Sequence, residues 1–256
     1  MDKLLLILGA KGFLGSYLHS YFEAVATTKV IPLYRPLFDI CDKATYEQLP
    51  PDKELLLFDA ITVNNWNKTD IKCVNIHGHK NFIDWLNSNN RRYHYVYFST
   101  LSTLKISEHL ANDYIVSKFI AENYIKEHCK NYTIIRVSFL FGKGENKNRL
   151  LSRIINKVQM GEDIQVDDVF LNLTPVGELG ILFKNNEFLK SREINFIDGV
   201  TYRLQELVSI ITEKINPAKS QVTFTEKKIN LAFNENYFTN GYTFKVKEAL
   251  VQMIEG

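Results

Sequence analysis

The sequence has little cysteine and no excess of charge of either sign. Its 256 residues include 3 cysteines, Cys41, Cys73 and Cys129, which are odd in number and widely spaced. This arrangement argues against a disulfide framework and favours reduced thiols in a cytoplasm. The 31 basic and 29 acidic residues give a net charge of +2. The composition therefore offers no electrostatic basis for nucleic acid or a membrane surface as the main partner.

Long hydrophobic runs are also missing. No stretch is long enough to span a bilayer, and the apolar run of residues 4–8 is too short for a signal peptide and ends in a glycine turn. We therefore expect a cytoplasmic protein with no membrane partner. Because 45% of the residues are hydrophobic, the chain can build one large globular domain, or one domain with a small appendage.

The most informative stretch is this apolar run and the glycine-rich segment that follows it. Residues 4–8 are typical of a strand buried on both faces, and apolar residues then recur at helical spacing up to Phe22. A pyrophosphate at such a junction meets backbone N–H groups and the positive end of a helix, and glycine lets the backbone approach it closely. We expect a nucleotide here, bound by Gly9, Lys11, Gly12, Phe13, Leu14 and Gly15.

Two details of this segment bear on the cofactor. The spacing is G-x-x-G-x-x-G and not the commoner G-x-G-x-x-G, so a glycine turn without a ligand is an alternative. An NAD-binding domain usually has Asp or Glu about 20 residues beyond the glycines, to bind the ribose 2′-hydroxyl. Here Arg35 ends the second predicted strand, and Lys11 lies within the turn. Unless both are solvated surface charges, two cations suit a 2′-phosphate, so we expect NADP(H), with NAD as the alternative.

Strand-like and helix-like segments alternate along the first 161 residues. This alternation predicts an α/β fold with a doubly wound parallel sheet of the Rossmann type and a ligand at the carboxyl ends of its strands. The pattern loosens after Gly161. We expect residues 1–161 to form a dinucleotide-binding domain, and 162–256 a small α+β substrate-binding domain interleaved with it. The expected strands include 54–59, 93–98 and 132–137, and the expected helices 69–87, 110–128 and 147–160.

A candidate catalytic pair lies in the helix expected over 110–128. Tyr114 and Lys118 are four residues apart, which places the phenol and the ammonium on one helical face. An ammonium lowers the pKa of a neighbouring phenol, as proton transfer to a carbonyl oxygen beside a nicotinamide requires. The preceding predicted strand ends in Ser99 and Thr100, whose hydroxyls suit the same substrate oxygen.

Together these residues resemble the extended short-chain dehydrogenase/reductases, the NAD-dependent epimerase/dehydratase family, over nearly the whole chain. The resemblance implies that Asp39 and Ile40 contact adenine and that Asn75 is the family's helix-four asparagine. It also implies that Thr100, Tyr114 and Lys118 are catalytic. Further resemblances are the run at 135–142, which packs near the nicotinamide in the family, and 174–179, its entry to the substrate domain.

Within the family the pattern is similar to nucleotide-sugar ketoreductases, the dTDP-4-dehydrorhamnose reductases among them. That resemblance implies NADPH-dependent reduction of a keto-deoxysugar nucleotide, of the 4-keto type, with the proton supplied by Tyr114. Family dehydratases carry Asp-Glu after the catalytic Thr, whereas Leu101 and Ser102 follow here, so we expect no dehydration. The alternatives are an NAD-dependent nucleotide-sugar epimerase and a non-catalytic dinucleotide-binding protein. Family members often dimerise through helices equivalent to 69–87 and 110–128, so a homodimer is also expected.

Several features depart from the family or carry a second interpretation. The gap between Thr100 and Tyr114 is about ten residues shorter than in the family, Asp59 stands where a small residue is usual, and Ser99 or Ser102 could replace Thr100. His77 and His79 lie two apart on a predicted helix and point in different directions, so we expect no metal site. Four basic residues suit either a substrate phosphate or a solvated helical face: Lys143, Lys147, Arg149 and Arg153.

Overall fold

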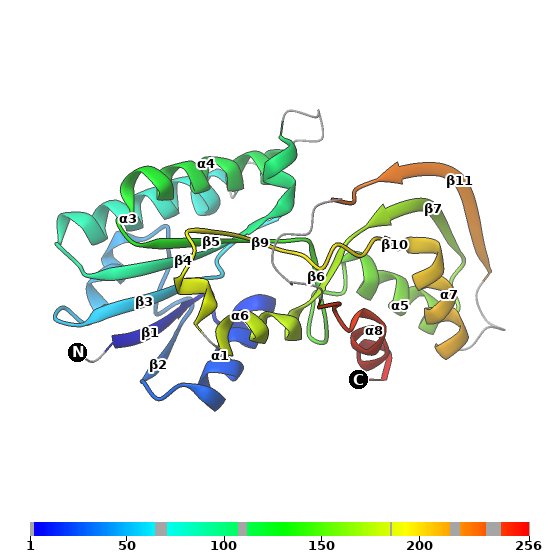
Figure 1. Ribbon diagram of the computed structural model, residues 1–256, viewed down its shortest axis with the longest axis horizontal. Helices are drawn as coiled ribbons and strands as arrows, with labels where there is room; N and C mark the ends of the chain where they lie inside the picture. Colours follow the sequence, from blue (N-terminus) through cyan, green and yellow to red (C-terminus); the bar gives the residue numbers. More distant parts are fainter. Residues whose placement is uncertain are drawn as a thin grey trace. The chain divides into compact units, whose positions relative to one another are not determined.

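The computed structural model describes residues 3–64, 71–106, 112–184, 186–215, 221–233 and 242–255. It divides the chain into two units (Figure 1). The first unit consists of residues 1–136 and 182–194, and the second of residues 137–181 and 195–256. The division therefore falls earlier than residue 161, and one later segment returns to the first unit. Among the described residues no helix is long and apolar enough to cross a membrane.

The first unit is built on a six-stranded sheet with the order β2-β1-β3-β4-β5-β9. β1 pairs in parallel with β2 and β3, and β3 in parallel with β4, which confirms the expected parallel α/β sheet. The strand order reverses beside β1, so the carboxyl ends of β1 and β3 form the switch point where such sheets bind ligands. The strands are β1 (Lys3–Leu8), β2 (Val30–Leu33), β3 (Glu54–Asp59), β4 (Tyr93–Thr100), β5 (Tyr132–Val137) and β9 (Glu193–Phe196).

Helices cover both faces of this sheet. In Figure 1, α3 and α4 lie on one face and α1 on the other. The expected helix at 69–87 is composite, because the π-helical turn η2 precedes α3; residues 69, 70, 110 and 111 lie outside the described part. The helices and helical turns are α1 (Phe13–Val25), η1 (Lys43–Gln48), η2 (Lys72–Gly78), α3 (His79–Ser88), η3 (Leu101–Lys105), α4 (Asp113–His128) and η5 (Glu187–Leu189).

An aromatic cluster fills the core under the α1 face and explains the return of residues 182–194. The Phe22 ring centre lies 4.6 Å from that of Phe58 and 5.1 Å from that of Phe183. Phe188, in turn, lies 5.6 Å from Phe183. Each buried aromatic ring removes a large apolar area from water, so these rings tie the returning segment to the sheet.

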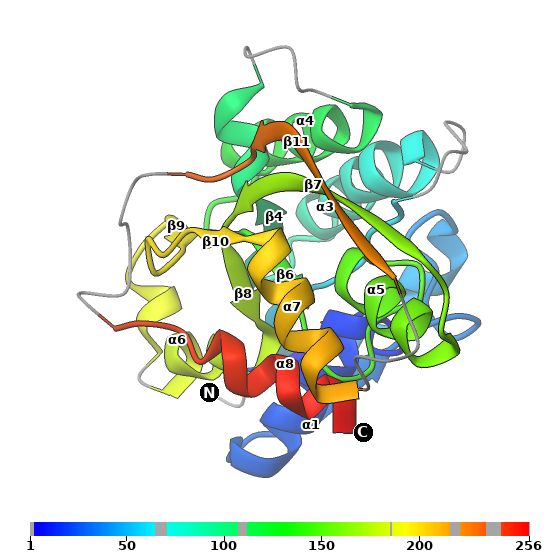
Figure 2. The same ribbon diagram turned by 90° about the vertical axis from the view of Figure 1, so that its right-hand side faces the viewer.

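The second unit has a mixed architecture. β7 (Ile164–Leu171) pairs in parallel with β11 (Val222–Asn230) and antiparallel with β10 (Tyr202–Arg203); Figures 1 and 2 both show β7 and β11 side by side. A second, two-stranded sheet is also present. This sheet consists of β6 (Phe139–Phe141) and β8 (Leu173–Pro175). The helices and helical turns of the unit are α5 (Leu150–Met160), η4 (Val176–Leu179), α7 (Leu204–Ile215) and α8 (Val246–Glu255). The chain passes to the first unit within α6 (Gly180–Lys184).

Candidate active site

The glycine turn between β1 and α1 is so tightly built that its glycines are required. Gly9 has φ 75°, in the left-handed region, and a Cβ at Gly15 would lie 2.1 Å from the Gly9 carbonyl oxygen. α1 begins after Gly12 without a side-chain cap and with no acidic residue in its first turn. The helix N-terminus therefore keeps its positive potential, and the absence of Cβ atoms leaves the close approach that a pyrophosphate needs.

The two cations assigned to a 2′-phosphate lie close to the end of β2. The Lys11 ammonium lies 4.0 Å from the centre of the Tyr34 ring, so the glycine turn adjoins the residue before Arg35. The Arg35 guanidinium, however, pairs with Asp39, with Nε 2.8 Å from Oδ2 and Nη2 3.1 Å from Oδ1. The side chain expected to contact adenine thus offsets part of the Arg35 charge.

Two other expected cofactor residues are buried and hold the surrounding backbone. Ile40 packs under η2, where a Cβ at Gly78 would lie 2.8 Å from Ile40 Cγ2. The Asn75 amide accepts from the Val63 backbone N–H and donates to the Val63 carbonyl, both at 2.9 Å. It also donates to Ser117 Oγ at 3.1 Å. Asn75 therefore connects the loop after β3 to α4, beside Lys118.

α4 carries the expected catalytic pair on its first turns. The Asn112 side chain caps the helix by accepting from the Ile115 N–H at 3.0 Å, which fixes where Tyr114 and Lys118 emerge. Lys118 is buried, and its ammonium donates to the Phe98 carbonyl at 2.9 Å. Burial lowers the Lys118 pKa to about 8, although Asp59 and Glu122 act in the opposite direction.

Lys118 lies beside the carboxyl-terminal part of β4, the strand that carries two of the candidate hydroxyls, Ser99 and Thr100. Its ammonium is 4.4 Å from the centre of the Tyr97 ring. Thr100, the last residue of β4, accepts from the Ser102 N–H at 3.3 Å, and their two hydroxyl oxygens are 3.4 Å apart. Ser99 is buried on the same strand face as Tyr97, and its hydroxyl has no hydrogen-bond partner within the described residues. Ser99 and Thr100 thus lie on the strand whose Phe98 carbonyl accepts from Lys118, and Ser102 lies beside Thr100.

Comparison with known proteins decides the family. The pattern of the NAD dependent epimerase/dehydratase family matches residues 5–177. The chain belongs to this family.

Solved structures share its fold across their whole length. RMD from Pseudomonas aeruginosa, complexed with NADPH, is 15% identical with a TM-score of 0.76 and 99% of each chain covered. UDP-glucuronic acid 4-epimerase from Bacillus cereus, in complex with NAD, is 14% identical with a TM-score of 0.77, covering 100% of this chain and 98% of that one. UDP-glucose 4-epimerase from Thermotoga maritima is 15% identical with a TM-score of 0.78 and the same coverage. None of the curated proteins matches significantly.

Asp59, the residue unusual for the family, is used inside the core. Its carboxylate is fully buried, accepts from the Ile61 N–H at 2.9 Å and from the Tyr95 hydroxyl, and lies 2.9 Å from His79 Nε2. Burial opposes its ionisation, but His79 and the hydrogen bonds outweigh burial and lower the Asp59 pKa. These partners account for the carboxylate, so its charge is held in the core.

His79 is held by two buried partners, the Asp59 carboxylate and a backbone carbonyl. Its Nδ1 lies 2.8 Å from the Val74 carbonyl oxygen, which can only accept, so Nδ1 carries the proton. No group of three or more His, Cys, Asp or Glu side chains suited to a metal occurs in the part of the chain that is described. The sequence signal for this contact was available in Asp59, a charged residue closing a buried apolar strand.

A buried ion-pair network that the sequence did not indicate supports the loop after β4. Glu122, on α4, accepts from Arg136 Nε at 3.0 Å and Nη2 at 2.5 Å. Arg136 Nη2 also lies 2.7 Å from Glu193. The Thr103 hydroxyl lies 2.9 Å from Glu122 Oε1 and 2.8 Å from the Thr100 carbonyl oxygen. The network thereby fixes η3, which begins after Thr100, to α4.

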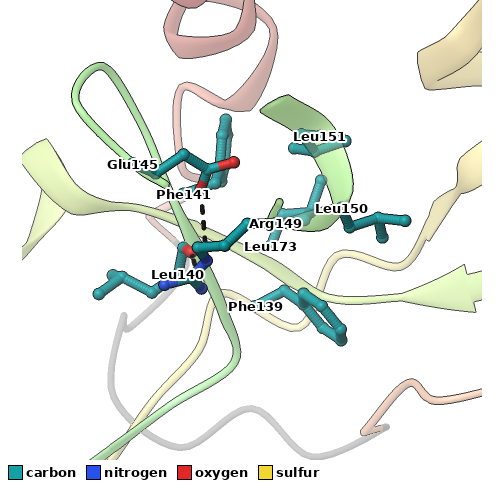
Figure 3. A pocket seen from close by; sticks show the side chains of 8 residues that line it. All are labelled: Phe139, Leu140, Phe141, Glu145, Arg149, Leu150, Leu151 and Leu173. Carbon is teal, nitrogen blue, oxygen red and sulfur yellow. Dashed lines mark hydrogen bonds and ion pairs between the residues drawn. The ribbon is translucent and has the colours of Figure 1, made fainter. Parts of the chain in front are cut away.

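Of the four basic residues near α5, the contacts of Arg149 show that it has structural partners. Arg149 donates to the Leu140 carbonyl at 2.6 Å and lies 3.6 Å from Glu145, as Figure 3 shows for the ion pair. The apolar cavity beside them has a volume of about 10 Å³, no more than one water needs, so it is no substrate pocket. The remaining three, Lys143, Lys147 and Arg153, are exposed.

Proposed function

We propose that the protein is an NADPH-dependent reductase of a keto-deoxysugar nucleotide, of the 4-keto reductase type. The observation that carries this proposal is the Lys118 ammonium, buried one helical turn after Tyr114 at the carboxyl end of β4. Family membership supports a nicotinamide cofactor and a nucleotide-sugar substrate. Bound NADPH would supply a hydride to the ketone carbon.

The chain's own residues would manage the proton and the substrate oxygen. Tyr114 donates its phenol proton to the alkoxide oxygen as that charge develops, and the Thr100 hydroxyl holds the same oxygen. The Lys118 ammonium favours the phenolate form of Tyr114 through its charge. Lys118 itself is kept in place by the Phe98 carbonyl. The site thus contains a proton donor, an oxygen-binding group and a cation that assists the donor.

The cofactor would be held by residues on two sides of the sheet edge. The Gly9, Gly12 and Gly15 cradle supports a pyrophosphate site: a Cβ at Gly12 or Gly15 would meet the Gly9 carbonyl oxygen, and a Cβ at Gly9 would meet Ile61, so no side chain fits in this turn. Lys11 and Arg35 support the 2′-phosphate of NADPH, with Asp39 as a competing partner of Arg35. Phe13 and Leu14, the first residues of α1, would place their backbone N–H groups against the phosphates. Ile40 would contact the adenine, and Asn75 would hold the loop after β3.

A tyrosine substitution tests the assignment. Tyr114→Phe should lower turnover of 4-keto nucleotide sugars by about 10²–10⁴-fold, followed as NADPH oxidation, and leave NADPH affinity within about twofold by calorimetry. The matched control is Tyr124→Phe, farther along α4, whose hydroxyl bonds the Asp84 carboxylate; it should keep turnover. Full activity of the Tyr114 variant would refute its role. Thr100→Val compared with Ser99→Ala decides which hydroxyl holds the oxygen.

An epimerase of the same fold is the second candidate, favoured by the Arg35–Asp39 ion pair, which weakens the argument for a 2′-phosphate. RMD was solved with NADPH and the Bacillus cereus epimerase with NAD, so this fold accommodates either cofactor. An epimerase would purify with NAD bound, whereas the reductase should purify empty and bind NADPH more tightly than NADH. Titration of the cofactor-stripped protein distinguishes the two, and a protein that binds dinucleotide without any turnover would be the non-catalytic alternative.

The proposal includes a homodimer and phosphate binding by Lys143, Lys147 and Arg153. α3 and α4 pack on each other and form the expected dimer surface. Among the described residues, however, the exposed large apolar side chains lie outside these two helices, so the interface would have to be polar. Sedimentation of the purified protein measures the oligomeric state directly.

A further inference from the structure

Two cysteine sulfurs from separate segments of the first unit lie almost at bonding distance. Cys41 follows the buried Ile40, and Cys73 is the second residue of η2, 32 positions later; their sulfurs are 2.6 Å apart. A separation of 2.6 Å is short even for two oxygens, which come this close only in charge-assisted hydrogen bonds. Because sulfur is larger than oxygen, the two sulfurs are closer than an ordinary contact between thiols. The gap exceeds a disulfide bond by only about half an ångström.

The surroundings of the two sulfurs differ in a way that suits oxidation. Cys73 is exposed and Cys41 half-buried, so an oxidant or reductant in solution reaches Cys73 first. Burial raises the Cys41 pKa to about 12, and the nearby Cys73 sulfur and Asp39 carboxylate add to this effect. Cys41 therefore stays protonated as a thiol while Cys73 meets the solvent, which assigns the first attack to Cys73.

We propose that Cys41 and Cys73 are a redox-active pair that forms a reversible intramolecular disulfide with a two-electron oxidant such as hydrogen peroxide. The Cys73 thiolate attacks a peroxide oxygen, the O–O bond breaks, and hydroxide leaves a sulfenic acid on Cys73. The Cys41 sulfur then attacks the Cys73 sulfur, the S–O bond breaks, and the Cys41 proton leaves with the hydroxyl as water. The sulfurs lose two electrons in total, and the peroxide becomes two waters. A dithiol reductant reverses the bond by exchange.

The cross-link would join two segments that surround the proposed adenine end of the site. The Cys41 backbone N–H donates to Asp39 Oδ1 at 3.0 Å, so the bond fixes the Asp39–Cys41 segment to η2. η2 also carries Asn75, which holds the loop after β3. The chemistry of the sulfur pair does not depend on the proposed function, because it needs neither cofactor nor substrate.

Thiol counting on the whole protein tests the pair. After reduction and removal of the reductant, the unfolded protein should show three thiols; after treatment with a small excess of hydrogen peroxide it should show one. Mass spectrometry of a non-reduced digest should find a Cys41–Cys73 peptide, and dithiothreitol should restore three thiols. Retention of all three thiols, a bond to Cys129, or a bond between two chains would overturn the proposal.

Single substitutions provide the matched controls. Cys129 is buried, with its sulfur 3.6 Å from the Tyr93 hydroxyl, so Cys129→Ser removes the thiol that takes no part. This variant should fall from two thiols to none with unchanged dependence on peroxide. Cys41→Ser and Cys73→Ser should form no intramolecular bond at the same peroxide concentration. Equal thiol loss in Cys41→Ser and in the unsubstituted protein would refute the pairing, whatever the stability of the variants.

Discussion

Arg136 and Lys118 are both buried cations of the first unit, and their surroundings differ sharply. Arg136 is paired with Glu122 and Glu193. Lys118 has a backbone carbonyl and the face of Tyr97, and no carboxylate within ion-pair distance among the described residues. Burial opposes both charges, but the carboxylates raise the Arg136 pKa, whereas the Lys118 pKa falls to about 8. The Arg136 charge is matched by carboxylates, whereas the Lys118 charge, which we propose to act in catalysis, has none beside it among the described residues.

Removing the Lys118 ammonium, which has no carboxylate partner among the described residues, should have the largest effect of all, and the effect should fall on catalytic activity. Lys118→Met should lower turnover by roughly 10³-fold or more, because the phenol loses the charge that favours its ionised form. The free energy of unfolding in urea should not fall, since an unpaired buried charge is replaced by an apolar chain of similar length. Lys126→Met is the control, because Lys126 lies on the same helix and pairs at the surface with Glu193; it should retain turnover. A Lys118 variant with full activity would break the comparison.

Removing the Arg136 guanidinium, which is paired with two carboxylates, should instead lower the stability of the fold. Arg136→Met leaves the Glu122 carboxylate buried without its main partner, and loss of one member of a buried pair costs about 3–5 kcal/mol. Urea denaturation measures this loss. The double variant with Glu122→Met should recover most of it, because no uncompensated charge remains. A loss below about 1 kcal/mol in the single variant would place Arg136 with ordinary surface charges.

The pH dependence of the unfolding free energy should reveal the lowered pKa of Lys118. The pKa of Lys118 is about 8 in the folded state and 10.5 as the ordinary value for lysine, so the unfolded state binds the proton more strongly. Its contribution therefore opposes folding below pH 8 and is relieved as the pH rises toward 10.5, by about 3 kcal/mol. Denaturation at each pH, compared with Lys118→Met, isolates this change. A difference that does not vary with pH would contradict the low pKa.

The Thr103 hydroxyl, which links the ion-pair network of Glu122 and Arg136 to η3, should have the smallest effect. Thr103→Val leaves one acceptor position on Glu122 unfilled and should cost about 1–2 kcal/mol of unfolding free energy. Thr223, which is exposed on β11, provides the control: Thr223→Val should change stability by less than about 0.5 kcal/mol. Equal effects of the two substitutions would mean that the Thr103 contact does not support η3.

The sequence by itself determined that the fold is a parallel α/β sheet and where most of its strands lie along the first 161 residues. The strands expected at 54–59 and 132–137 have the observed bounds, because both are rich in apolar residues that a parallel strand buries on its two faces. The glycine turn and the spacing of Tyr114 and Lys118 are equally local, since they depend on backbone conformation and on one helical turn. Such features can be deduced from neighbouring residues alone.

Only the tertiary structure decided the environment of those residues. Lys118 meets the Phe98 carbonyl across 20 positions, Arg136 meets Glu193 across 57, and Cys41 meets Cys73 across 32. The identity of the His79 partner of Asp59 and the return of residues 182–194 were likewise not evident from the pattern. These contacts join segments that meet only after the sheet and its helices have packed. The periodicity of apolar residues along a segment predicts which face of a helix or strand is buried, but it does not predict which other segment packs against that face.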